Sequence, residues 1–281
     1  MRIRMNMLLR RAAFAGCMIL AALRLTGCAQ FAAVSEAAFM MSPDEEQQLG
    51  VKMQAEVAKQ YHINNDPSIN SYVQSLGQNL WTNSPKGEIP PHFHVIDDDA
   101  INAFAIPGGD VYVQTGAIRA AADEAELAGV IAHELGHVVR RHSARGVSRE
   151  TGLSTIQQIA LGSDAGQATT LVSSMLSQSL VLRYSRADES EADTIAVGTL
   201  DRAGYDPEGL TTFFATLKQK YGDQGSGPVA TLFASHPPTT DRMTNVETLI
   251  KQLPTPPKKN RPKTALQQIQ SRLPPPAPAA K

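Results

Sequence analysis

The chain has 281 residues, carries 26 lysines and arginines against 27 aspartates and glutamates, and contains two cysteines. This length is enough for one sizeable hydrophobic core, and a hydrophobic content of 42% supplies the side chains for it. The formal net charge of −1 argues against a nucleic-acid-binding protein, and two cysteines exclude a disulfide-rich scaffold.

The first residues have the pattern of a bacterial lipoprotein signal peptide. Four arginines lie within residues 1–11, an apolar stretch follows, and Leu25-Thr26-Gly27-Cys28 resembles a lipobox. The apolar stretch is short for a bilayer-spanning helix, which disfavours an uncleaved anchor. We therefore expect residues 1–27 to be removed, Cys28 to be acylated, and residues 28–41 to act as a tether.

Removal of this segment would change the net charge and indicates a location. The segment carries five arginines and no acidic residue, so 26 basic residues would fall to 21 against 27 acidic ones, a net charge of −6. An acidic mature chain is not expected to bind nucleic acid. Ala29 and Gln30 follow Cys28 in place of the aspartate associated with inner-membrane retention, so we expect an outer-membrane lipoprotein that faces the periplasm.

Two helices and a hairpin are predicted before the central motif. Ser42-Pro43-Asp44-Glu45 has the capping-box pattern of a helix start, and Asp66-Pro67 begins a second helix. Residues 103–106 and 111–113 are apolar and flank a Pro-Gly-Gly-Asp turn, which is typical of a β-hairpin.

The motif His133-Glu134-Leu135-Gly136-His137 is the most informative part of the chain. Apolar residues recur at near-helical spacing between Ala121 and Val139, so a helix is predicted to carry the motif. Side chains four residues apart share a helical face, so both imidazoles can reach one zinc ion, with Glu134 beside them as a candidate general base. The alternative is a helix that places two histidines four apart by chance on a hydrated face.

A catalytic zinc site needs a third protein ligand, and an acidic segment further along the chain offers candidates. A predicted helix that runs to Gly204 carries four carboxylates, those of Asp188, Glu189, Glu191 and Asp193. Glu189 and Asp193 share one face of this helix, and Glu191 points away from it. Spacing alone does not choose among the four, and a solvated acidic face is the alternative.

The rest of the chain adds a helix, one notable histidine and a proline-rich end. Asp206-Pro207 begins the helix. His236 precedes two prolines, where a histidine most often lies in a loop with an ordinary hydrogen bond. After Leu253 the chain is rich in proline and lysine, so residues 254–281 are predicted to be a disordered tail, within which residues 264–273 could form a short helix.

Together these elements predict an α+β fold that is mainly helical, with a small sheet or hairpin beside the helix of the HExxH motif. One domain is expected to span residues 42–253, since its length suits a single core.

Several motifs in this order resemble a known family of zinc peptidases. HExxH is followed by Ser185-Arg186-x-x-Glu189-x-x-Ala192-Asp193, and then by His236-Pro237-Pro238 before Arg242. Further matching segments are residues 102–109, residues 126–128 and His142. The pattern is similar to that of the gluzincin metallopeptidase family of HtpX, the CAAX prenyl protease, BepA and LoiP, with the periplasmic BepA- and LoiP-like lipoprotein proteases the most similar.

The resemblance implies a ligand set and a resting state. Glu189 corresponds to the third zinc ligand, Asp193 to a supporting residue that accepts the second N–H of a ligand histidine, and Glu191 to no ligand position. In BepA-like members the histidine of the His-Pro segment is a movable fourth ligand that keeps the enzyme latent, which makes His236 a candidate regulatory ligand. One Zn2+ per chain is implied, held by His133, His137 and Glu189.

The chemistry follows from these parts. Zinc would polarise the scissile carbonyl and lower the pKa of the attacking water, and Glu134 would take the proton of this water and pass it to the leaving amine. A donor to the oxyanion is also expected, with Arg186 or a histidine outside the ligand set as candidates.

The hairpin is the expected substrate-binding element. In related zinc peptidases an edge strand before the HExxH helix pairs with the extended substrate through backbone hydrogen bonds. The alternative is a hairpin that only completes the core. The corresponding residues here are Ala103, Phe104, Ala105, Val111, Tyr112 and Val113.

We therefore predict a lipid-anchored periplasmic zinc endopeptidase that acts on misfolded or misassembled envelope proteins, with the outer-membrane assembly machinery as a partner and no nucleic acid. The substrate class comes from the resemblance alone. The alternatives are a chaperone-like outer-membrane assembly factor with a latent zinc site and a structural metalloprotein. Glu134 favours catalysis, because a structural zinc site has no use for a general base.

Overall fold

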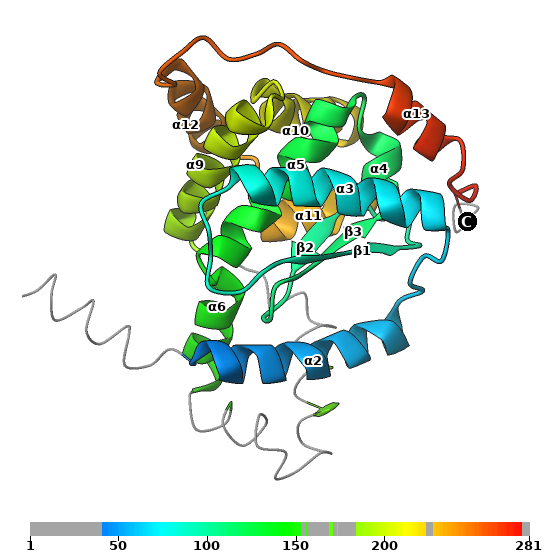
Figure 1. The fold of residues 1–281 in the computed structure, drawn as a ribbon, viewed down its shortest axis with the longest axis vertical. Coiled ribbons are helices and arrows are strands. Elements are labelled where there is room, and N and C mark those ends of the chain that lie inside the picture. Colours follow the sequence, from blue (N-terminus) through cyan, green and yellow to red (C-terminus); the bar gives the residue numbers. More distant parts are fainter. Residues whose placement is uncertain are drawn as a thin grey trace, which may run out of the picture. The chain divides into compact units, whose positions relative to one another are not determined.

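The computed structural model describes residues 41–152, 156, 169–170, 173, 184–222 and 227–276, which Figure 1 shows in colour. The chain divides into two units between Met40 and Met41, and all described residues belong to the second. The predicted signal peptide and Cys28 lie outside the described residues. Within the described ranges, no helix is long and apolar enough to cross a membrane.

The strands form one three-stranded sheet whose middle strand is β3 (Asp110–Gln114). β1 (His92–Ile96) runs parallel to β3, and β2 (Ala103–Ala105) runs antiparallel to it on the other side. β2 and β3 form the predicted hairpin, whose turn places Gly108 and Gly109 at positive φ, a conformation that glycine adopts without steric cost.

The central position of β3 corrects one prediction about substrate binding. The backbone of a middle strand is hydrogen-bonded to neighbours on both sides, so Val111, Tyr112 and Val113 have no edge to offer to a substrate. Of the predicted substrate segment, only the β2 residues belong to a strand with one side unpaired among the described strands.

Different helices bury the two faces of the sheet. Val111 packs in the larger core with α3 (Pro67–Asn83) and α5 (Glu124–Val139), whereas the next residue, Tyr112, packs in a second cluster with α2 (Pro43–Gln60). Successive side chains of a strand point to opposite faces, so α2 covers the face opposite to α3 and α5. Figure 1 shows α2 on one side of the sheet and α3 and α5 on the other.

The helices begin where the sequence signals place them. Ser42 forms a capping box with Glu45 at the start of α2, and Asp66 accepts two backbone N–H groups at the start of α3. Asp123 caps α5 by accepting the N–H of Glu126. The helix starts predicted at Ser42 and Asp66 are confirmed.

α5 lies at the centre of the helical layer, packed between two further helices that follow it in sequence, α9 and α10. The mainly helical α+β fold is thus confirmed. The remaining helices are α4 (Thr115–Ala120), α6 (His142–Thr151), α9 (Arg186–Ala203), α10 (Glu208–Tyr221), α11 (Ala230–Ser235) and α12 (Thr240–Lys251), with a 3-10 turn at Gly227–Val229.

The segment that follows Leu253 corrects the prediction of a disordered tail. As far as residue 276 it lies against the domain, where α13 (Thr264–Gln270) packs on α3 and α4. Although the surrounding sequence is rich in proline, apolar residues at helical spacing pack into the larger core. The domain therefore extends beyond residue 253. These residues are Leu266, Ile269 and Leu273.

Substitution in α13 tests this extension of the domain. Leu266 is 1% exposed, so Leu266→Ala should lower the free energy of unfolding by about 2–5 kcal/mol through lost burial and the cavity left behind. Chemical denaturation of the purified protein measures this change. Gln268→Ala, at an exposed position of the same helix, is the control and should leave stability within about 0.5 kcal/mol. Equal stability of the two variants would mean that the segment contributes no core.

Candidate metal centre

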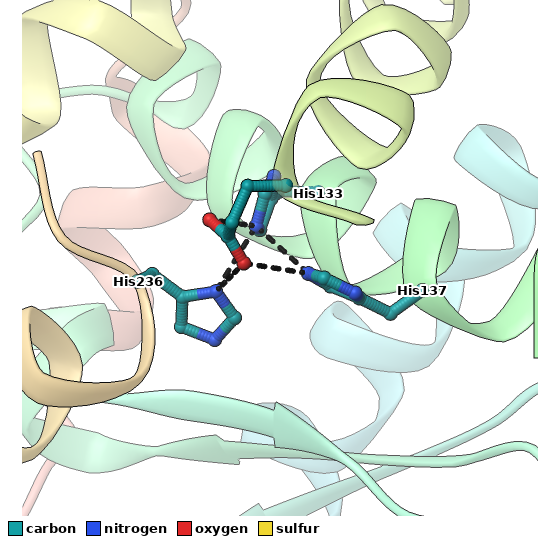
Figure 2. Close-up of side chains that lie close together, drawn as sticks. His133, His137 and His236 are labelled. Atoms are coloured by element: carbon teal, nitrogen blue, oxygen red, sulfur yellow. Dashed lines mark hydrogen bonds and ion pairs between the residues drawn. The ribbon is translucent and has the colours of Figure 1, made fainter. Parts of the chain in front are cut away.

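Four side chains from three parts of the chain bring metal-binding atoms together (Figure 2). His133 and His137 lie one turn apart on α5, with their Nε2 atoms 3.0 Å from each other. Glu189 comes from α9 and places its Oε1 atom 3.4 Å from Nε2 of His137. His236 follows α11 and places its Nδ1 atom 3.2 Å from Nε2 of His133 and 2.9 Å from Oε1 of Glu189.

The spacing of these atoms suits a tetrahedral metal ion. Zinc with four ligands at about 2.0–2.1 Å sets neighbouring donor atoms about 3.3–3.4 Å apart. Four of the six distances among the donor atoms are 2.9 to 3.4 Å, all four atoms lie within 4.8 Å of one another, and all four side chains are buried. Burial also holds the pKa of His137 well below its usual value, which keeps the imidazole neutral and its lone pair available to a metal. The residues present therefore fit a zinc ion.

Glu134 lies beside this cluster without being part of it. The residue is 1% exposed, and its Oε1 atom is 3.5 Å from Nε2 of His236. Its Oε2 atom has no hydrogen-bond partner among the described residues. Burial raises the pKa of Glu134, although the neighbouring imidazoles of His236 and His133 oppose this effect. A buried carboxylate with a free oxygen and a raised pKa is suited to accept a proton.

Asp193 and Arg242 form a buried pair behind His133. Oδ1 of Asp193 lies 2.9 Å from Nδ1 of His133, so the carboxylate can accept the second N–H of this histidine. Arg242 donates to both oxygens of Asp193 at 2.7 and 2.8 Å, and its Nη1 atom lies 2.6 Å from Oε2 of Glu189. Burial alone would raise the pKa of Asp193, but the guanidinium outweighs it and keeps the carboxylate ionised.

Sequence reasoning gave no role to Arg242 or to Tyr184. Arg242 stood in the motif that begins at His236, and this spacing was the available signal. Tyr184 stacks on the ring of His137 with a centroid distance of 3.7 Å, and its hydroxyl lies 2.9 Å from Oγ of Ser143. Ser143 in turn donates to the carbonyl of Ala105 in β2, so Tyr184 links the ligand helix to the predicted substrate strand. For Tyr184, the only signal in the sequence for a role at the site was its position just before the helix that carries the acidic residues.

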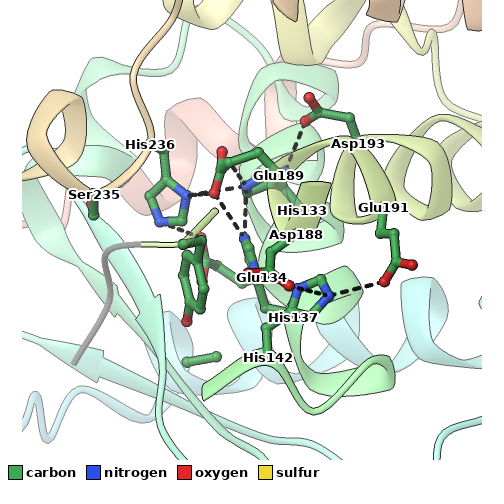
Figure 3. Close-up of polar contacts among 12 residues, drawn as sticks. His133, Glu134, His137, His142, Asp188, Glu189, Glu191, Asp193, Ser235 and His236 are labelled. Carbon is green, nitrogen blue, oxygen red and sulfur yellow. Dashed lines mark hydrogen bonds and ion pairs between the residues drawn. The ribbon is translucent and has the colours of Figure 1, made fainter. Parts of the chain in front are cut away.

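Two other residues of α9, Arg186 and Glu191, lie outside the ligand cluster. Arg186, predicted as an oxyanion donor, is the first residue of α9 and is exposed. The carboxylate of Glu191 is 45% exposed and faces His142 instead of the ligand atoms (Figure 3). Of these two glutamates, the structure brings only Glu189 into the group of candidate metal-binding side chains.

A glycine brings the two ligand-bearing helices together. A Cβ atom at Gly136, inside the HExxH motif, would lie 2.7 Å from the Cα atom and 2.8 Å from the carbonyl oxygen of Ala192 on α9. Only glycine permits this approach, because such contacts are far shorter than van der Waals distances. The approach at Ala192 lets Glu189 and Asp193, on either side of it, reach the histidines of α5.

Two histidines on one helix, a glutamate from a second helix and a free buried glutamate after the first ligand are the parts of a gluzincin metallopeptidase site. Residues 67–250 match the family model of peptidase family M48, and the chain belongs to this family. The resemblance inferred from the motifs is thus confirmed.

Relatives of known name agree with this assignment. The chain is 32% identical over 186 residues to the beta-barrel assembly-enhancing protease of Escherichia coli (strain K12), an alignment that covers 63% of this chain and 38% of the relative. It is 32% identical over 213 residues to the mitochondrial metalloendopeptidase OMA1 of Schizosaccharomyces pombe, covering 74% and 61%. It is 33% identical over 183 residues to metalloprotease YcaL of Escherichia coli, covering 62% and 65%. The chain thus spans about two fifths of the length of the assembly-enhancing proteases that it matches.

Gly136→Ala tests whether helix approach sets the ligand geometry. The added methyl group must displace α9, so zinc content after dialysis should fall well below one ion per chain, as measured by elemental analysis. Gly198→Ala on α9 is the control, since its Cβ atom would meet only the flexible end of Arg202 at 3.1 Å. This variant should retain zinc and gain up to about 1 kcal/mol of stability. Full zinc occupancy in Gly136→Ala would refute the role given to the glycine.

Proposed function

We propose that this protein is a zinc-dependent endopeptidase of the bacterial cell envelope that hydrolyses misfolded or misassembled envelope proteins. The observation that carries the proposal is the buried four-donor cluster with Glu134 beside it. A structural zinc site uses no general base, whereas Glu134 is buried next to the cluster with one carboxylate oxygen unpaired among the described residues.

Each residue of the site has a distinct task in this proposal. A zinc ion held by His133, His137 and Glu189 supplies Lewis-acid polarisation of the scissile carbonyl and acidifies the attacking water. Glu134 takes the proton of this water and returns it to the leaving amine, for which its raised pKa is suited. Asp193, fixed by Arg242, holds His133 in the orientation that presents Nε2 to the metal.

The substrate strand is proposed to pair with the outer edge of β2. The N–H of Ile106 donates to Asp110 and that of Gln114 to Asn102, so by alternation the peptide groups of Ala103 and Ala105 point away from β3. These groups could pair with an extended peptide of almost any sequence. Ala103 and Ala105 are fully buried, however, and Ser143 occupies the carbonyl of Ala105. The edge is therefore closed in this conformation.

The position of His236 supports a latent resting state. Its Nδ1 atom completes the donor cluster, at the place that a catalytic site keeps open for water. The side chain follows α11 in a segment of its own, so it can leave without any change in α5 or α9. Its departure would leave the three-ligand site that catalysis needs. The same observation favours the second candidate function, a chaperone-like assembly factor whose zinc site stays latent.

Location and partners are proposed from the sequence and from the names of relatives. The lipobox-like segment before Cys28 supports a lipid-anchored protein on the periplasmic side of the outer membrane. Relatives named beta-barrel assembly-enhancing protease support unfolded or misassembled envelope proteins as substrates and the outer-membrane assembly machinery as a partner. The acidic charge expected after signal-peptide removal supports no role for nucleic acid. Zinc is proposed over other divalent metals because the candidate donors are three imidazoles and one carboxylate, all within 4.8 Å of one another.

Glu134→Gln tests the hydrolytic mechanism. Loss of the general base should lower the rate of casein cleavage by a factor of about 10²–10⁴ while zinc content stays at one ion per chain. A chelator should abolish the activity of the wild type, and added zinc should restore it. Glu191→Gln, on the exposed carboxylate of α9, is the control and should retain most of the activity. Equal cleavage by Glu134→Gln and the wild type would mean that Glu134 is not the base.

His236→Ala tests latency with the same assay. Removal of the fourth donor should raise casein cleavage at least about tenfold, equivalent to ~1.4 kcal/mol of autoinhibition. His92→Ala, at an exposed position of β1, should not change the rate. The His236→Ala variant could instead be inactive on casein and still prevent aggregation of an unfolded outer-membrane protein. This result would favour the chaperone-like assembly factor over the peptidase.

A further inference from the structure

The two ligand histidines of α5 are held from behind by different residues. A metal ligand that binds through Nε2 must carry its proton on Nδ1, and this N–H needs an acceptor to fix the ring. His133 has Asp193 as acceptor. His137 instead has another histidine, since its Nδ1 atom lies 2.8 Å from Nδ1 of His142 (Figure 3).

The contact between His137 and His142 has one consistent arrangement of protons. Two imidazole nitrogens at 2.8 Å attract only if one carries a hydrogen and the other a lone pair. Binding of a metal through Nε2 assigns the hydrogen to Nδ1 of His137, so Nδ1 of His142 must be the acceptor. A neutral His142 then carries its own hydrogen on Nε2.

Hydrogen-bond acceptors for this N–H lie next to Nε2 of His142, on the side of the ring away from His137. Its Nε2 atom lies 3.2 Å from Oε2 of Glu191 and 3.6 Å from Oδ1 of Asp188, so carboxylates are there to accept the hydrogen. Both acids come from α9, and Arg145 holds Asp188 through Oδ1 at 2.9 Å. The helix that supplies the third ligand, Glu189, thus also anchors the residue behind the second one.

An unusual backbone turn brings His142 into place. The residue before it, Arg141, adopts a left-handed conformation with φ 56°, the one positive φ at a non-glycine residue in the described chain. Such a conformation is disfavoured for a long side chain and persists where the surroundings hold it. Here Arg141 bonds to Glu46 at 2.6 Å, to Glu88 at 3.0 Å and to the carbonyl of Met41 at 2.8 Å. The turn joins α5 to α6 and places His142, fully buried, against Nδ1 of His137.

We propose that His142 is a positioning residue of the metal centre, which fixes the tautomer and ring orientation of His137 by accepting its Nδ1–H and transmits this constraint to Glu191 and Asp188 on α9. This inference rests on the metal-binding part of the proposed function and does not depend on peptide hydrolysis. His142 lies off the ligand-binding face and itself binds no metal.

A zinc-competition titration with a chromophoric chelator, made without substrate, tests this proposal on the full chain. His142→Leu removes the acceptor and should weaken zinc binding about 10–100-fold, the usual effect of losing such a partner. His142→Asn places an amide oxygen near the position of Nδ1 and should retain affinity within about threefold of the wild type. His142→Gln keeps a polar side chain of similar size but carries its amide near the position of Nε2, so it should weaken binding as leucine does.

Controls separate this effect from general destabilisation. His94→Leu is the matched control variant. His94 also pairs with a carboxylate, since its Nε2 atom lies 2.6 Å from Oδ1 of Asp110, but it is not one of the residues of the ligand cluster. This variant should bind zinc with wild-type affinity. The absorption spectrum of the cobalt-substituted protein should differ from that of the wild type in His142→Gln and match it in His142→Asn. If His142 served only for packing, this difference between the two variants would not be expected. If His142→Leu fails to fold, the comparison of the asparagine and glutamine variants decides.

Two results would overturn the proposal while leaving the proposed function intact. One is wild-type zinc affinity in both His142→Leu and His142→Gln. The other is an equal loss of affinity in the asparagine and glutamine variants, which would reduce His142 to a packing residue. A wild type that binds no zinc would overturn both this inference and the proposed function.

Discussion

The close contact of α5 with α9 at Gly136 and Ala192 is the constraint on which the metal centre depends. Helices with ordinary side chains at their contact lie 8–10 Å apart, whereas a glycine at the crossing lets the backbones approach further. The short glutamate and aspartate side chains of α9 can then reach the imidazoles of α5, and this reach fixes both the third ligand and the support of His133. The residue between the two histidines of the motif is therefore as much a part of the site as the ligands.

The balance of buried charge explains why this arrangement suits a divalent cation. Glu134, Glu189 and Asp193 are all at most 5% exposed, and Arg242 offsets one of their three negative charges. Two negative charges remain if the histidines are neutral, and uncompensated charges in a buried site are strongly unfavourable. A divalent cation neutralises them. A neutral His142 behind His137, instead of another carboxylate, fits the same balance because it adds no charge.

Much of the site could be predicted because its chemistry is tied to local spacing. The HExxH pair and the helix caps at Ser42 and Asp66 each depend on residues within one or two turns, so the sequence alone indicates them, whereas Glu189 was chosen among four carboxylates by the resemblance to a family. The features that the sequence did not indicate have a different origin. They depend on how segments pack in space, and the hydrophobic periodicity of the sequence does not indicate this packing. Examples are the central place of β3, the packing of Leu266 and Ile269, and the contact of His142 with His137. The proline-rich composition after Leu253 led to the prediction of disorder, although Leu266, Ile269 and Leu273 pack in the larger core.

The anchoring of Arg141 by α2 has a consequence for where the functional unit begins and ends. The family match covers residues 67–250, yet Met41 and Glu46 hold the turn before His142, and Arg261 binds the cap residue Asp123 at 2.7 Å at the other end of the HExxH helix. Both ends of α5 are thus held by segments outside the region that defines the family. A fragment cut to that region would keep every candidate ligand and lose the contacts that hold the ligand helix at each end.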